Sequence, residues 1–437
     1  MRITWDLIKR LEYWFAQFSI CFFVGVWSFE SLFIASEGAS NVFFSTRLLD
    51  PVLSLMQHSI FLTTIFTFTV LNWEKLLGSL IHRRLPWILF FFICSSFLWS
   101  DFRHETLMKS VSLFETVFFG AYWGTCFPLQ RQIRMLQVAF ALAAALSIVV
   151  SVLIPSAGKE AGVHAGAWRG IFAHKNYLAR EMSLGALLGR MTTPQNKSEQ
   201  RLSIFLMVSA IVLVVMSTSK TGLLILLVTL AFAEIFRSLR LELGLVLLTW
   251  ASSIFMLSGL ISFIAANFEA IVTALDRDPT LSGRTIIWGA LIDKIHLRPW
   301  LGYGYYGFWH GAYGESAVIS KIITAYIPPH AHNGLFDLVI AFGLIGLILF
   351  SLNLLSLVRR AIILARNTIT QEGLWPLCYA TLLIFYNQTE STLVEHNSIF
   401  WLLFISLLAA DFRRLVSHEI TLKDGRPDLQ ISEILRG

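Results

Sequence analysis

The sequence predicts an all-α protein that crosses a membrane many times, built as one integral membrane domain over residues 1–437. Apolar residues make up 56% of the chain, charged residues only 14%, and the mean hydropathy is +0.66. A soluble protein carries nearer a quarter charged residues, because its surface faces water. The apolar residues also gather in runs that can cross about 30 Å of hydrocarbon. These observations exclude a soluble enzyme, a disordered chain and a disulfide scaffold.

About twelve apolar runs are candidate membrane spans. A chain in hydrocarbon must satisfy its own backbone hydrogen bonds, so each run is expected to be a helix. The first run follows an amphipathic start and is expected to be a retained span rather than a cleaved signal. The runs lie near residues 14–36, 52–72, 86–100, 107–126, 135–154, 172–189, 202–217, 221–236, 243–265, 333–356, 374–387 and 398–411.

The distribution of Lys and Arg predicts the orientation of these spans. When the N-terminus is placed inside, 21 of the 34 basic residues fall in the inner segments, and every inner segment contains some. The positive-inside rule then places both termini in the cytoplasm, with a tail over residues 412–437. It also makes residues 266–332 one large outer loop between the ninth and tenth spans.

The remaining basic residues need a reason other than topology. Most of them cluster near residues 155–180 and within 266–332, and eight of the eleven histidines lie on the same outer side. An anionic ligand reached from outside is the first explanation, and a loop packed on lipid headgroups is the alternative. The net charge of +6 therefore does not point to nucleic acid.

The outer loop is expected to be partly helical. The segment from Arg284 carries an apolar stripe of helical spacing, and Pro299 stops the helix. Arg284 lies on that stripe and in the first turn, where free backbone N–H groups favour an anion such as phosphate. A pairing of Arg284 with Asp276, Asp278 or a headgroup is the alternative. The stripe consists of Trp288, Leu291, Ile292 and Ile295.

Two further segments of the loop carry candidate functional residues. Glycines alternate with aromatic residues over 301–309, which suits either a platform for sugar rings or a membrane-interface belt. His332 then precedes the tenth span, where the positive end of the helix dipole favours a neutral imidazole that can act as a base. His330 and His332 could instead bind a metal, but the spacing supplies no third ligand, so neither a metal nor a cofactor is expected.

Several short motifs together resemble the O-antigen ligase superfamily, which also contains polymerases of exopolysaccharide and O-antigen repeat units. The resemblance runs from about residue 165 to 405 and ends in Thr389-Glu390-Ser391. Each motif is weak alone, whereas their order along the chain is more specific. The motifs are Trp168–Asn176 (WRGIFAHKN), Ser219-Lys220-Thr221, Ser282-Gly283-Arg284 with Trp288, Arg298–Gly304 (RPWLGYG), His330–Gly334 (HAHNG) and Gly343–Gly346 (GLIG).

The resemblance implies a GT-C-like glycosyltransferase of the bacterial inner membrane whose active site faces the periplasm. It implies a donor glycan on undecaprenyl pyrophosphate, an acceptor glycan or lipid A core, and a chain-length regulator as a further partner. It also implies that the reaction needs neither metal nor nucleotide. His332 matches the essential histidine of the family, and Arg284 and Arg169 match arginines expected to hold the pyrophosphate.

Four more residues are candidate substrate ligands. His174 and Lys175 belong to the HKN motif, and Lys220 stands where the family often has arginine, so the bidentate fork is lost there. Arg180 lies inside a predicted span, where charge is costly and a functional role is the default expectation, although a local ion pair is equally expected. Lys175, Lys220 and Arg180 would all add positive charge near a pyrophosphate.

The sequence leaves three functions open. The Trp168–Asn176 motif favours a polymerase over a ligase, and the absence of an internal repeat disfavours a flippase or transporter. Glu390 and Glu395 are rival general bases to His332. Asp337, one turn into the tenth span, is a candidate for orienting the second ring nitrogen of His332.

Overall fold

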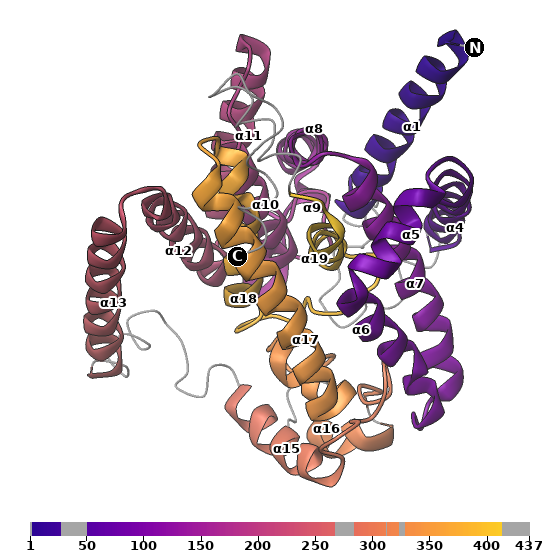
Figure 1. Ribbon diagram of the computed structural model, residues 1–437. Coiled ribbons are helices and arrows are strands. Elements are labelled where there is room, and N and C mark those ends of the chain that lie inside the picture. Colours follow the sequence, from indigo (N-terminus) through magenta and orange to yellow (C-terminus); the bar gives the residue numbers. More distant parts are fainter. Residues whose placement is uncertain (1, 28–49, 267–283, 312, 323–327, 413–437) are drawn as a thin grey trace.

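The protein is an irregular bundle of helices (Figure 1). The computed structural model describes residues 2–27, 50–266, 284–311, 313–322 and 328–412. Within these ranges there is no β-strand, which confirms the all-α prediction. Asp276, Asp278, the Ser282-Gly283 pair and the tail from residue 413 lie outside the described residues, so the expectations about them stay predictions.

The helices follow the predicted apolar runs along the chain. A described helix overlaps each of the twelve runs. They are α1 (Arg2–Phe23), α4 (Asp50–Phe66), α6 (Arg84–Ser95), α7 (Arg103–Cys126), α8 (Leu129–Leu153), α10 (Lys175–Arg190), α11 (Lys197–Met216), α12 (Lys220–Arg237), α13 (Leu243–Ala266), α17 (Gly334–Asn367), α18 (Trp375–Tyr386) and α19 (Ile399–Ala409). Between the runs lie α5 (Trp73–His82), α9 (Pro155–Gly158), α15 (Arg284–Leu297) and α16 (Ala317–Ile322).

Four of the described helices are long and apolar enough to cross a membrane. They are α8, α11, α12 with the turn that follows it, and α17, and the pair α5 and α6, bent by 84°, is a fifth candidate. Several helices also expose large apolar side chains on the outside of the bundle, among them Leu224 and Phe255. Both features fit a protein that crosses a membrane several times. The count of twelve spans stays a prediction.

Short helices fill the interior of the bundle. All eleven residues of α19 are buried, and α19 lies at the centre of the bundle (Figure 1). At 1.5 Å per residue it is about 17 Å long, which is less than the hydrocarbon thickness. It packs closely on α7, where a side chain at Gly124 would collide with the backbone of Ser406. The interior is therefore held by helix–helix packing through small residues.

The long helix α17 is broken near its start, and the outer loop fills the break. Gly343 has a left-handed φ of 61°, and the backbone groups on either side of it are bonded by residues 299–304. Tyr303 N–H donates to the Ile340 carbonyl at 2.9 Å, and Leu344 N–H donates to the Pro299 carbonyl at 2.8 Å. The Gly-aromatic segment is thereby fixed against the first turns of α17.

The predicted helix of the outer loop is present as α15. Its buried face consists of Ile287 and Leu291, with Trp288 and Ile295 beside them. Ile292 was expected on this face but is 45% exposed, because the contact with α17 is centred on Ile287 and Leu291. The Trp288 ring stacks on Phe336 of α17 at 5.6 Å. In Figure 1, α15 and α16 lie together at the end of the bundle where α17 begins.

Candidate functional site

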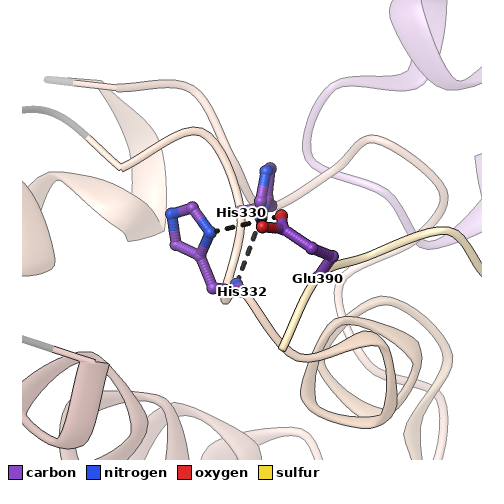
Figure 2. A group of neighbouring side chains, drawn as sticks. All are labelled: His330, His332 and Glu390. Atoms are coloured by element: carbon purple, nitrogen blue, oxygen red, sulfur yellow. Dashed lines mark hydrogen bonds and ion pairs between the residues drawn. The ribbon is translucent and has the colours of Figure 1, made fainter. Parts of the chain in front are cut away.

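The candidate site is centred on His330, His332 and Glu390 (Figure 2). The two imidazole rings are 4.2 Å apart between centroids, and His332 N–H donates to His330 Nδ1 at 3.1 Å. His332 Nδ1 lies 3.7 Å from Glu390 Oε2 and is buried, with no hydrogen-bond partner among the described residues. His332 has a φ of 52°, a conformation that costs energy for a residue with a side chain. Backbone strain of this kind is common at functional sites.

The histidine segment, residues 330–332, is fixed by Asp337 on the first turn of α17. Both carboxylate oxygens of Asp337 accept the Ala331 N–H at 3.1 Å. The same carboxylate accepts the Trp309 indole N–H at 2.7 Å and the Ser391 hydroxyl. Asp337 was expected to orient the ring of His332, and this expectation is wrong because its oxygens bond the backbone between the two histidines and two neighbouring loops.

Helix capping and an indole complete the support of this segment. Asn333 caps α17, its side-chain oxygen accepting the N–H of Leu335 at 3.0 Å. Trp288 of α15 donates its indole N–H to the Ala331 carbonyl at 2.9 Å. The expected position of His332 just before a helix N-terminus is confirmed. Asp337 and Trp288 bond the backbone next to His332 from two sides, so the imidazole is attached to a fixed backbone.

Glu390 is the anionic centre of the site. Burial alone would raise the pKa of its carboxyl, but His332, His330 and Arg284 outweigh burial and hold the pKa below its usual range. Glu390 is therefore a carboxylate at neutral pH, and a carboxylate with a low pKa is a weak general base. It suits the role of a partner for a charged imidazole better than the role of a rival base.

His330 is a neutral imidazole at neutral pH. Burial is the largest cause that lowers its pKa to about 3, and the positive charges of His332, Arg284 and Arg180 add to the effect. The influence of Arg284 on both His330 and Glu390 puts its guanidinium within electrostatic range of the site. Arg284 is the first residue of α15, as the predicted anion-binding position requires.

The HKN motif, His174-Lys175-Asn176, lies on one side of Glu390 and is called the HKN wall of the site. The Asn176 amide donates to Glu390 Oε1 at 3.5 Å, and the Ser219 hydroxyl donates to Asn176 Oδ1 at 3.2 Å. Lys175 is buried, and its ammonium donates to the Thr218 hydroxyl at 3.5 Å. The HKN motif and His332 therefore both contact Glu390, and Ser219 contacts the HKN motif.

Glu160 is the acidic partner of the HKN motif. Its carboxylate accepts the Lys175 N–H at 2.8 Å and lies 3.7 Å from His174 Nε2. Arg169 is 5% exposed, and its Nε donates to the Ala157 carbonyl at 2.7 Å. Burial lowers the pKa of Arg169, and Glu160 opposes this effect. His174 is within electrostatic range of both Arg169 and Glu390, which links this wall to the centre.

Arg180 and Lys220 occupy different surroundings. Arg180 lies 3.2 Å from Glu181 and 3.6 Å from Glu395, and its guanidinium covers the rings of Tyr177 and Phe400. The expected local ion pair is thus present, and the positive charge of Arg180 is balanced by these two carboxylates. Lys220 is an exposed residue at the start of α12, which Ser219 caps.

The Gly-aromatic segment does not offer the expected aromatic faces. Tyr303, Tyr305 and Phe308 are buried in the protein. A sugar platform or an interfacial belt needs exposed rings, so neither interpretation fits these three residues. Tyr306 is the exposed member, with its hydroxyl 3.3 Å from His396 Nδ1. The glycines instead allow a close backbone approach at Gly302, where a Cβ would lie 2.6 Å from the backbone of α17.

Comparison with known proteins agrees with this geometry. Residues 205–351 match the model of the O-antigen ligase family, a span that contains Arg284 and His332. This part of the chain is therefore similar to the O-antigen ligase domain. Glu390 and the Trp168–Asn176 motif lie outside the matched residues but contact the domain's histidine segment or its neighbours.

Two curated relatives resemble parts of the chain. The "Exopolysaccharide production protein ExoQ" of Rhizobium meliloti is 32% identical over 113 residues, which are 25% of this chain and 26% of the relative. The "Putative polysaccharide ligase" of Rickettsia felis is 33% identical over 78 residues, which are 17% of this chain and 19% of the relative. The chain therefore aligns with about a quarter or less of each relative's length.

Proposed function

We propose that the protein is a glycosyltransferase that moves a glycan from an undecaprenyl-pyrophosphate donor to a sugar hydroxyl at the periplasmic face of the bacterial inner membrane. The observation that carries this proposal is the meeting of a half-buried histidine, a carboxylate and an arginine within the part of the chain that matches the O-antigen ligase family and its neighbouring loops. A base and a cation are the two groups that transfer from a pyrophosphate-linked sugar requires.

His332 is the proposed general base. Its Nδ1 is directed toward Glu390, so the tautomer with a proton on Nδ1 leaves Nε2 free to accept the proton of the acceptor hydroxyl. The acceptor oxygen then bonds the anomeric carbon while the bond from that carbon to the pyrophosphate oxygen breaks. The reaction inverts the anomeric configuration. Glu390 stabilises the imidazolium that forms, as the acidic member of a catalytic triad does.

The cationic residues are proposed to hold the leaving pyrophosphate. Arg284 is the foremost candidate, because its charge acts on His330 and Glu390 and it stands at the N-terminus of α15. Arg169, Lys175, His174 and Lys220 would add positive charge along the HKN wall. Arg180 would contribute less, because Glu181 and Glu395 balance its charge. This chemistry needs no metal.

The test is transfer by the purified protein with a lipid-linked donor. His332→Ala is expected to lower the rate roughly 10²–10⁴-fold, the usual contribution of a general base. His104→Ala changes another histidine of the predicted outer face, which is exposed, and should keep the wild-type rate. Full transfer by a folded His332→Ala protein would refute the role of the base.

The acceptor distinguishes the two forms of the proposal. The name of the Rhizobium meliloti relative and the HKN motif favour a polymerase that extends a lipid-linked glycan. A polymerase should lengthen lipid-linked repeat units in the absence of lipid A core. Attachment of glycan to added lipid A core would identify a ligase. Movement of lipid-linked sugar across proteoliposomes without a new glycosidic bond would identify a flippase instead.

A further inference from the structure

His330, His332 and Glu390 bring three potential metal-ligand atoms together. The sequence spacing supplied only two histidines, and the fold supplies the third ligand from the loop after α18. One ligand atom from each residue lies within 4.8 Å of the others. Two imidazoles and one carboxylate are a donor set that Zn²⁺ uses in proteins. Mg²⁺ and Ca²⁺ prefer oxygen ligands throughout, so the set discriminates against them.

One distance between ligand atoms is close to the value that a bound zinc ion requires. Ligand atoms at about 2.0–2.2 Å from a tetrahedral Zn²⁺ are roughly 3.3–3.5 Å from one another. His332 Nδ1 and Glu390 Oε2 are already 3.7 Å apart. Small rotations of side chains would complete the set, and Figure 2 shows all three side chains converging on the same space.

Two further features suit metal binding: a fixed backbone between the histidines and a ring nitrogen without a hydrogen bond among the described residues. Asp337 fixes the peptide between the two histidines, so the rings stay on one side at little further entropic cost. His332 Nδ1 is a buried polar atom without a hydrogen bond among the described residues, which is the state of an unused ligand. Arg284 is the opposing influence, because its positive charge repels a cation. Reversible binding is therefore expected.

We propose that these three residues bind one Zn²⁺ ion reversibly and that the bound ion inhibits the enzyme. Inhibition rests on the proposed function, since zinc on His332 removes the lone pair or the orientation that a general base needs. Three protein ligands leave a fourth position of the ion open to water or to an anion. Zinc here is an inhibitor and not a cofactor of transfer.

Zinc binding is tested on the full-length protein in detergent, first stripped with EDTA. Calorimetry with ZnCl₂ alone should give one site per chain, and MgCl₂ should give none. His330→Gln and Glu390→Gln should each weaken binding at least tenfold. His396→Gln, which changes a histidine of the same loop as Glu390 but outside the cluster, should leave it unchanged. Unchanged zinc affinity in both site variants, with melting temperatures like that of the wild type, would overturn the site.

Inhibition is a separate measurement. Transfer by the wild type should persist in EDTA and fall on addition of Zn²⁺. The zinc concentration that halves the rate should rise at least tenfold in His330→Gln, relative to that variant's own rate in EDTA. Zinc binding without loss of transfer would overturn inhibition, and transfer that requires zinc would make the ion a cofactor. A protein that binds zinc but transfers no glycan under any condition contradicts the proposed function and leaves the metal site in place.

Discussion

Glu390 Oε2 lies 3.7 Å from Nδ1 of His332, and the two residues come from loops on either side of the α17–α18 helix pair. Asn176 reaches the other oxygen of the same carboxylate from a third loop. A half-buried carboxylate beside an imidazole stabilises the imidazolium form, because solvent screens the pair less than it would at an exposed site. This pairing assigns Glu390 a positioning role, which the following variants test.

Glu390→Gln should reduce turnover without changing the donor KM. Glutamine keeps the shape and loses the charge, so the imidazolium on His332 is no longer stabilised. We expect a loss of roughly tenfold to hundredfold, smaller than the 10²–10⁴ expected for the base itself. Steady-state kinetics with a lipid-linked donor measure the change.

Glu390→Asp is the matched control for this variant, because it restores the charge at a greater distance. It should recover part of the turnover that the amide loses. A merely structural Glu390 would instead give equal losses in both variants, together with lower melting temperatures.

Arg284→Ala should lower kcat/KM for the lipid-linked donor. A charge-assisted hydrogen bond to phosphate contributes about 1.5–3 kcal/mol, which is roughly a tenfold to hundredfold change in kcat/KM. Arg284→Lys should fall between alanine and wild type, since lysine keeps the charge but not the bidentate fork. Competition by inorganic pyrophosphate should weaken in parallel.

Arg298→Ala serves as the control for Arg284, because Arg298 follows the same helix and pairs with Asp101 at 2.9 Å. Such a partly exposed ion pair contributes little to stability. Its loss should leave the donor kinetics near the wild-type values. Equal effects at both positions would mean that Arg284 acts through the fold of the loop.

The sequence predicted those parts of the fold that depend on local patterns. The helical character of each apolar run, the helix that begins at Arg284 and the helix start after His332 follow from periodicity and capping residues. The break at Gly343 was missed, because Gly343 lies in a continuous apolar run. The break is held by backbone hydrogen bonds to residues 299–304, which are distant in the sequence and which a local pattern cannot reveal.

The sequence identified several residues of the candidate site but not the contacts between them. His332 and Arg284 were found because they stand in motifs. Glu390 was assigned as a rival base because neither its low pKa nor its contact with Asn176 can be read before the loops are packed. Glu160 was missed altogether, although an acidic residue near the basic HKN motif was a usable signal.

Gly343→Ala should destabilise the protein. A Cβ at this position would lie 2.3 Å from the backbone of Trp300, and the left-handed φ of 61° adds strain. The cost should exceed about 1–3 kcal/mol, the usual cost of such a backbone conformation, because the clash adds to it. Thermal unfolding in detergent, followed by tryptophan fluorescence, should show a melting temperature lower by several degrees.

Gly289→Ala is the control for a glycine-to-alanine change. An added Cβ at Gly289 in α15 meets nothing within 4 Å. Alanine favours a helix over glycine by about 1 kcal/mol, so the melting temperature should stay the same or rise. A melting temperature for Gly343→Ala that matched this control would contradict the broken geometry of α17.

His396 should make stability depend on pH below neutrality. Burial, with a smaller effect of the Lys109 charge, lowers the pKa of His396 to about 4, while Tyr305 and Tyr306 contact its ring nitrogen. The unfolded chain has a histidine pKa of about 6.5, so between pH 6.5 and about 4 it binds more protons than the folded protein. Stability is therefore lost as the pH falls through this window.

His396→Gln removes that titration and should flatten the pH dependence. The melting temperature of the wild type should fall more steeply than that of His396→Gln from pH 6.5 to pH 4, and the two proteins should run in parallel between pH 7 and 8. His104→Gln, at an exposed position, should follow the wild type throughout. Parallel curves for wild type and His396→Gln over the acidic range would show that His396 is not held neutral by burial, because only a depressed pKa in the folded protein produces the difference in slope.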